Sequence, residues 1–400
     1  MYLQSVVTAA LFLALVVSHP VRDAAVASEQ TLDILSSIAK RNTFKTLDDA
    51  YRSINTNRTC TPHNISVRKE WGSLSGKERI AYTDAVLCLQ SKSSLTPPEL
   101  IPGARSRFDD FVGTHINQTN FIHYTGTFLA WHRYFGYVYV EALRNECGYK
   151  GDQPYWNWGL FSNNTEAGPV FDGSATSMSG NGEFIPGRGD IDVGAPGFGP
   201  TYLPAGNGGG CVKSGPFANM TVNLGPVDLP INGGGSVTGS GLEYNPRCLV
   251  RDIGTAVNNK YANSTSIANL LTGHDDIYWF QMVMQGIPGK EDIGVHPGGH
   301  YTIAGNPGSD AYISPGDAAF YLHHGMVDRV WWLWQNQDLA NRQNAISGTG
   351  TLLNNPPSPN TTLDTIIDVG FAGTKGYGPI AMRDLMSTVA GPFCYTYDSL

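Results

Sequence analysis

Apolar positions at helical spacing recur along this chain, and they are separated by long stretches with no regular spacing. The spacing predicts one long aromatic helix over residues 121–147 and further helices over about 264–286 and 316–340. A helix is also predicted from residue 66, because Ser66 is a suitable N-cap residue and Glu70 follows it. Residues 99–115 are expected to run from a loop into a helix.

The middle of the chain has a different pattern. Residues 173–242 hold 19 of the 47 glycines and very few charges. Such a stretch predicts a long irregular excursion, and long loops in compact domains are often functional. With no repeat at a fixed period and no Pro-rich or Ser-rich linker, the pattern favours one catalytic domain of helices and long loops.

Composition narrows the function classes. The chain has 400 residues, of which 41% are hydrophobic and 15% charged, and its net charge is −8. A chain this long and this weakly charged can bury a substantial core, which argues against disorder. Because no run of Lys or Arg stands out, a nucleic-acid partner is not expected.

The N-terminus predicts export. Residues 5–17 form an apolar run that is too short to span a bilayer, which needs about 20 residues. We interpret residues 1–18 as a signal peptide cut after Ser18, with a buried N-terminal helix as the alternative. Residues 19–45 then form an N-terminal segment, either a propeptide or a helix, and residues 46–400 form the catalytic domain. No later segment is predicted to enter a membrane.

The cysteines agree with a secreted protein. None of the six belongs to a C-x-x-C pair, which argues against zinc-ribbon and thioredoxin sites. An even number in a secreted chain predicts three disulfides, and fifteen pairings are open. One of them, Cys211 with Cys248, would close the Gly-rich region. Sequons that permit glycosylation on export begin at Asn57, Asn64, Asn117, Asn163, Asn219, Asn263 and Asn360.

Histidines carry the candidate chemistry. Six of the ten can be arranged in two sets of three: His115, His123 and His132, and His296, His300 and His324. The i,i+4 spacing of His296 and His300 places both imidazoles on one face of a helix, where they can hold one metal ion.

The donor type favours copper. Imidazole suits copper, zinc, iron and nickel, and no carboxylate stands at ligand spacing in either set. Three neutral imidazoles without a thiolate let copper cycle between Cu(I) and Cu(II). Two such ions facing each other can deliver two electrons to O2, whereas zinc in the same site would bind without redox chemistry.

Residues near these histidines in the sequence are expected to orient the ligands and to enclose the site. Asp328 lies four residues after His324 on the same helix face, so its carboxylate is expected to orient a ligand imidazole. The alternative is a surface pair with Arg329. The site is expected to be walled by Phe128, Trp131, Phe135, Phe320, Trp331 and Trp332.

Five motifs together resemble one family. They are FLAWHRYF (128–135), PYWNW (154–158), SPGDAAFYLHHGMVDRVWWLWQ (314–335), VRKEW (67–71) and CYTY (394–397). The chain resembles the tyrosinase family of type 3 binuclear copper proteins over about residues 60–397. That family includes tyrosinases, catechol oxidases and haemocyanins. Because the chain stops soon after CYTY, it resembles the short secreted fungal type that lacks a C-terminal lid domain.

The resemblance implies a fold, a cofactor and a reaction. The expected fold is mainly α, with a four-helix bundle that holds two copper ions, long irregular loops and few short strands. His115, His123 and His132 would hold the first copper, and His296, His300 and His324 the second. His323, Phe128 and Tyr301 would lie beside the ligands. The expected reaction oxidises o-diphenols to o-quinones with O2 reduced to water, so the partners are O2 and a small phenol.

Departures from the family pattern refine this expectation. Phe121 replaces the cysteine that forms a thioether in many fungal relatives. Gln285 and Pro297 stand where monophenol-hydroxylating members often have Glu and Asn, so weak or absent monophenol hydroxylation is predicted. By motif counting, the small Ala311 lies over the second copper and leaves it open.

Two other functions are alternatives to a general catechol oxidase: a secondary-metabolite oxidase with one aromatic substrate and a haemocyanin-like O2-binding protein. The oligomeric state is not predicted.

Overall fold

Eleven α-helices and twelve short strands are present in the part of the chain that the structure describes, so the mainly α prediction is confirmed. The computed structural model describes residues 7–52, 60–194, 197–373 and 376–398; in the first of these ranges it describes the side chains of residues 24–49 only. The helices are α1 (Val7–Arg52), α2 (Gly76–Ser91), α3 (Arg107–Ile122), α4 (Phe128–Cys147), α5 (Thr255–Tyr261), α6 (Ser264–Gly273), α7 (Ile277–Gln285), α8 (Val295–Ile303), α9 (Gly305–Gly308), α10 (Ala319–Gln337) and α11 (Leu339–Arg342).

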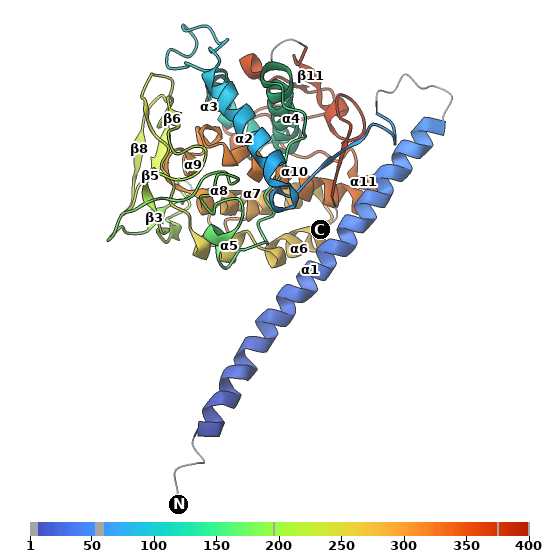
Figure 1. The fold of residues 1–400 in the computed structure, drawn as a ribbon. Helices are drawn as coiled ribbons and strands as arrows, with labels where there is room; N and C mark the ends of the chain where they lie inside the picture. The colour runs from blue at the N-terminus through green and yellow to red at the C-terminus, as the bar shows by residue number, and fades with distance from the viewer. Residues whose placement is uncertain (1–6, 53–59, 195–196, 374–375, 399–400) are drawn as a thin grey trace, which may run out of the picture.

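The strands form two-stranded pairs. Strands β2–β8 lie at one side of the helical body, and α1 runs along the other (Figure 1). The strands are β1 (Ser66–Arg68), β2 (Gly182–Phe184), β3 (Ile191–Asp192), β4 (Tyr202–Leu203), β5 (Gly209–Val212), β6 (Thr221–Val222), β7 (Asp228–Pro230), β8 (Ser236–Thr238), β9 (Arg247–Cys248), β10 (Ile366–Ile367), β11 (Ile380–Ala381) and β12 (Tyr395–Tyr397).

The predicted helix start at Ser66 is wrong. Residues Ser66–Arg68 form β1, which pairs in parallel with β12 near the end of the chain. The helix begins at Gly76, because Ser75 and Glu78 form a complete capping box. Their three-residue spacing lets each side chain reach the other's main-chain N–H, whereas Ser66 and Glu70 are four apart.

The predicted helix over 121–147 is broken. Helix α3 ends at Ile122 and α4 begins at Phe128. Between them Tyr124 takes a left-handed backbone conformation with φ of 50°, which no helix interior contains. The turn makes His123 the C-cap residue of α3. The predicted helix over 264–286 is likewise divided, because Asp276 caps the N-terminus of α7.

Helix α10 is the centre of the fold. Its residues from Ala319 to Asn336 are all buried, and it packs against α1, α4, α6 and α8. Helix α4 packs in turn against α2 and α3. A helix that is buried on every face needs neighbours on every side. The helices that carry the candidate histidines therefore meet around α10.

Helix α1 runs through the expected boundary between residues 45 and 46. Leu32, Ser36, Ala39, Thr43 and Leu47 repeat at helical spacing and are buried. This face packs on α6 and α10, while the first turns of α1 project beyond the body (Figure 1). The predicted cleavage after Ser18 falls where side chains lie outside the described residues. Within the described chain, every helix is too short or too polar to span a bilayer.

Three disulfides close the fold, as the cysteine count predicts. Cys211 pairs with Cys248, which confirms that suggestion for the Gly-rich region. The other pairs are Cys60–Cys394, beside the parallel strands β1 and β12, and Cys88–Cys147, between α2 and the end of α4.

Candidate metal centre

The first histidine cluster comes from α3, its C-cap and α4. The ring centroids of His115 and His123 are 5.2 Å apart, and that of His132 lies 5.8 and 5.0 Å from them. One candidate ligand atom from each ring lies within 4.8 Å of the others. The turn at Tyr124 makes this possible, because a continued helix would carry His123 away from His115.

Main-chain carbonyls orient all three rings of the first cluster. The Nδ1 atoms of His115, His123 and His132 lie 2.8, 3.0 and 2.8 Å from the carbonyl oxygens of Tyr312, Thr119 and Phe128 respectively. A carbonyl oxygen only accepts, so each Nδ1 carries the hydrogen and each Nε2 offers its lone pair. Within the described residues, Nε2 of His115 and of His132 is buried without a hydrogen-bond partner.

The second cluster comes from α8 and α10. His296 and His300 project from α8 as predicted, and their Nε2 atoms are 3.2 Å apart. Nε2 of His324 lies 3.3 Å from Nε2 of His300. The structure also brings in His323, whose ring nitrogens lie close enough to join the same candidate metal group.

The two clusters face each other. The rings of His132 and His324 are stacked, with centroids 4.5 Å apart and an interplanar angle of 15°. Phe128 packs at 5.0 Å against both His132 and His296. Phe320 lies 5.6 Å from His115 of the first cluster and 4.1 Å from His324 of the second. Two aromatic rings therefore bridge the clusters.

Two predicted wall residues face elsewhere. Trp331 lies under the guanidinium of Arg133, 3.7 Å away. Trp332 packs against Tyr397 and donates its indole hydrogen to Thr43 of α1. Trp331 lies on nearly the same face of α10 as His324 but two turns, about 10 Å, further along, and Trp332 is rotated off that face by about 80°.

Burial keeps these imidazoles neutral. Removal from water lowers the pKa of His115 to about 3, helped by nearby His123, and lowers the pKa of His123 to about 4. The same desolvation, with neighbouring imidazoles, holds the pKa values of His132, His300 and His324 well below the usual range. Neutral imidazole is the form that binds metal.

The donor set fits a metal ion in each cluster. Buried nitrogen atoms without partners are costly unless something satisfies them, and among the described residues Nε2 of His115 and of His132 are such atoms in the first cluster. In the second cluster Nε2 of His300 lies 3.2 and 3.3 Å from Nε2 of His296 and of His324, so three imidazole nitrogens converge there as well. Both candidate groups consist of histidine alone. An all-imidazole set suits copper, zinc, iron or nickel more than calcium or magnesium, which prefer oxygen.

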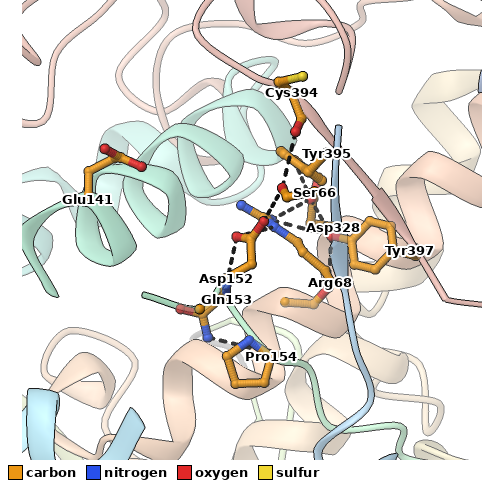
Figure 2. Close-up of polar contacts among 12 residues, drawn as sticks. Ser66, Arg68, Glu141, Asp152, Gln153, Pro154, Asp328, Cys394, Tyr395 and Tyr397 are labelled. Atoms are coloured by element: carbon orange, nitrogen blue, oxygen red, sulfur yellow. Dashed lines mark hydrogen bonds and ion pairs between the residues drawn. The ribbon is translucent and has the colours of Figure 1, made fainter. Parts of the chain in front are cut away.

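Asp328 does not orient a histidine, contrary to the prediction. Its carboxylate accepts from Arg133 at 2.5 Å, from Arg68 at 3.2 Å, and from the hydroxyls of Tyr395 and Tyr397. Figure 2 shows Arg68 between Asp152 and Asp328, with both tyrosines turned toward Asp328. The alternative pair with Arg329 is wrong as well.

This network joins the helices that carry the two clusters. Arg133 follows His132 on α4, and Asp328 lies one turn after His324 on α10. Arg68 comes from β1 and the two tyrosines from β12. Burial alone would raise the pKa of Asp328, but the charges of Arg133 and Arg68 and the two tyrosine hydrogen bonds outweigh it and lower the pKa, so the carboxylate is charged. Among the described residues, Asp328 therefore ties α10 to α4, β1 and β12 and bonds to no imidazole.

The remaining predicted residues surround the clusters in different ways. Gln285 is buried, and its side-chain oxygen accepts from the N–H of Tyr124 at 2.8 Å. Its amide donates to the carbonyl of Gln281. Pro297 is half-buried on α8 between His296 and His300. Tyr301 packs with Leu203, Val257, Tyr261 and Ile293.

Ala311 is exposed, and its placement over the second copper stays a prediction. Its neighbour Tyr312 contacts the first cluster through the bond to His115. Phe121 is exposed as well.

Sequence reasoning missed the groups that orient the first cluster. Thr119, Phe128 and Tyr312 act through main-chain oxygens, so their side-chain identities carry no signal of the role. Sequence did suggest that His323 lies beside the ligands. It packs against Trp158 at 5.2 Å and against His300 at 4.3 Å.

Comparisons with known proteins agree with this geometry. Residues 105–337 match the family model described as the common central domain of tyrosinase. Tyrosinase P of Aspergillus terreus is 41% identical over 337 residues, covering 83% of this chain and 91% of that protein. N-acetyl-6-hydroxytryptophan oxidase of Emericella nidulans is 38% identical over 357 residues, covering 85% and 94%.

A solved structure has the same fold. The polyphenol oxidase of Thermothelomyces thermophila superposes with a TM-score of 0.86 at 45% sequence identity. The match covers 92% of this chain and 98% of that one.

Proposed function

The chain belongs to the tyrosinase family of type 3 copper oxidoreductases, and from this premise we propose that it oxidises o-diphenols to o-quinones with O2 reduced to water. In this proposal His115, His123 and His132 hold one copper ion, and His296, His300 and His324 hold the second. One observation supports it most: two all-histidine clusters face each other across the stacked rings of His132 and His324.

The protein's own residues prepare this chemistry. Copper ions held there would supply the redox chemistry: two catechols give up two electrons and two protons each, and one O2 takes up the four electrons and four protons to become two water molecules. The main-chain carbonyls hold the first three imidazoles with their Nε2 lone pairs toward the metal. Phe128 and Phe320 restrict water between the clusters, since both are buried. A phenol is expected to approach beside His300, which is partly exposed.

We further propose that monophenol hydroxylation is weak. The reaction on a monophenol needs a base to remove the phenolic hydrogen before the ring binds metal. Gln285 has no ionisable group, and its amide is already bonded to Tyr124 and Gln281. Pro297 offers neither an N–H nor a side-chain amide to hold a water molecule. Both residues support oxidation of diphenols over monophenols.

A second candidate is an oxidase of one aromatic metabolite. One relative is named for a single substrate, N-acetyl-6-hydroxytryptophan, and it spans nearly the same length. Under this alternative the residues of β2–β8 select the substrate, and simple catechols are turned over slowly.

The proposed location is outside the cell. The signal peptide predicted over residues 1–18 supports it, and three disulfides suit an oxidising compartment. Mass spectrometry of protein from culture medium tests this directly. A mature chain beginning near His19 agrees with the proposal, and retention of residues 1–18 contradicts it.

The activity test is O2 uptake by copper-loaded protein with 4-methylcatechol and p-cresol in parallel, with zinc-loaded protein as control. Rapid uptake with the catechol alone is expected. Comparable uptake with both substrates contradicts the proposed role of Gln285 and Pro297. No uptake with either, at two coppers per chain, favours the single-metabolite enzyme or an O2 carrier.

A substitution sharpens the monophenol test. Pro297 lies in the first turn of α8, where a proline and another residue are both tolerated, so Pro297→Asn is expected to fold. The amide can then hold water, and the ratio of p-cresol to 4-methylcatechol turnover should rise. An unchanged ratio would remove Pro297 from the explanation.

A further inference from the structure

Asp310 lies in the turn before the motif that contains His324, and none of its atoms is exposed. One carboxylate oxygen accepts from the main-chain N–H groups of Val227 and Asp228, at 2.7 and 3.0 Å. The other accepts from the N–H of Tyr312 at 3.0 Å. The side chain therefore joins the Gly-rich excursion to the turn over residues 310–312.

That turn contacts the first histidine cluster. The carbonyl oxygen of Tyr312 lies 2.8 Å from Nδ1 of His115. The hydroxyl of Tyr312 donates to Asn120 on α3 at 3.2 Å, which fixes the residue at a second point. Asp310 holds the N–H of Tyr312, and Tyr312 holds the ring of His115. An unbroken series of hydrogen bonds thus runs from the excursion to a candidate ligand.

We propose that Asp310 is a positioning residue for the first metal site, through which the Gly-rich excursion fixes the imidazole of His115. The inference rests on the proposed copper site. His115 needs such support because it is the one member of its cluster whose acceptor carbonyl comes from a distant segment. His123 and His132 bond to carbonyls four residues earlier in the chain.

The chemistry of the turn requires a carboxylate. Three N–H groups converge on two oxygens, and both oxygens must accept. An amide at the same position would turn its NH2 group toward at least one donor. Two facing donors repel, and a buried N–H would lose its partner, so Asn is a disruptive replacement despite its shape.

The test measures copper affinity at one cluster at a time. In the background His296→Asn only the first cluster is complete, and in the background His132→Asn only the second is complete. Copper-free protein is titrated with copper in competition with a chelator of known affinity. Asp310→Asn should weaken the first cluster by about tenfold or more, as loss of outer contacts to ligands typically does, and leave the second unchanged.

A matched control separates positioning from general loss of stability. Asp192→Asn removes a half-buried carboxylate in the same excursion, one oxygen of which accepts from the main-chain N–H groups of Gly194 and Thr201 at 2.9 Å. This variant should bind copper like the parent at both clusters. If Asp310→Asn does not fold, Asp228→Pro is the second variant. It removes one of the three N–H donors and keeps the carboxylate of Asp310, so a smaller loss of copper affinity is expected at the first cluster.

The outcomes are distinct. Unchanged affinity at the first cluster, or equal weakening of both clusters, overturns the role of Asp310. Two tightly bound coppers in the parent without turnover of any phenol contradicts the proposed function and leaves the affinity test of Asp310 intact.

Discussion

Each ring of the first histidine cluster points its Nδ1 at a main-chain carbonyl, whereas Nδ1 of His296 and of His324 in the second cluster has no hydrogen-bond partner among the described residues. The first cluster is thus held by hydrogen bonds that fix both ring orientation and tautomer. The second relies on the spacing within α8 and on packing. Hydrogen bonds behind a ligand raise its basicity and metal affinity.

Packing in the second cluster has an identifiable contact. A Cβ atom added at Gly299 would lie 2.3 Å from the ring of His323. Only glycine lets α8 approach α10 this closely, and the approach brings His296 and His300 to His324. One fold thus holds its candidate metal ligands in two ways, by main-chain hydrogen bonds in the first cluster and by packing in the second. We expect the two clusters to differ in copper affinity for this reason.

The largest expected effect comes from loss of one ligand. His132→Asn in the first cluster and His324→Asn in the second should each abolish catechol turnover, because two-electron chemistry needs both ions. Copper measured by mass spectrometry should fall from two ions per chain to about one. Substantial turnover in either variant would contradict the assignment of that histidine.

Acid should destabilise the copper-free protein. The folded-state pKa values of His115 and His123 are about 3 and about 4, below the unfolded value of about 6.5. The unfolded chain therefore binds more protons between these limits, and the free energy of unfolding falls as pH falls. The loss should be about 0.7 kcal/mol per buried histidine between pH 7 and pH 6. Urea unfolding at both values measures it, and an unchanged midpoint contradicts the buried neutral state.

Loss of the charge at Asp328 should reduce stability without favouring either cluster. Asp328→Asn leaves Arg133 and Arg68 buried without their shared carboxylate. Breaking a buried ion pair on one side costs about 3–5 kcal/mol. Urea unfolding should show this loss. A selective loss of copper from one cluster would mean that Asp328 supports that cluster directly.

Addition of a methyl group at Gly299 should act on the second cluster alone. Gly299→Ala pushes α8 from His323 and should weaken copper binding there by about tenfold, the lower end for a disturbed ligand shell. His323→Ala in the same chain should restore affinity, because it removes the clash. Gly136→Ala on α4 is the matched control, since nothing lies within 4 Å of its added Cβ. Weakening at the first cluster would contradict the packing account.

The helix content and six clustered histidines were predictable from sequence, because apolar spacing and i,i+4 histidines are local patterns. The break at Tyr124 was not, since a left-handed residue between two aromatic segments leaves no clear signature. The misplaced start at Ser66 shows that a capping box depends on a spacing of three, which Ser75 and Glu78 satisfy.

The wrong predictions near the site concern which partner a group bonds to. Asp328 does lie one turn after His324, but its carboxylate bonds to Arg68 and two tyrosines instead of to a histidine. These partners come from strands β1 and β12, which are distant from Asp328 in the sequence. Tyr312 orients His115 through a carbonyl that every residue possesses. Long-range partners and main-chain acceptors are set by the tertiary fold, so one sequence could not show them.

The most direct test compares the two clusters within one protein. Copper affinity should be measured for the first cluster in His296→Asn and for the second in His132→Asn, by competition with the same chelator. We predict that the first cluster binds copper at least about tenfold more tightly, because its imidazoles are held by main-chain hydrogen bonds. Equal affinities, or tighter binding by the second cluster, would contradict this account.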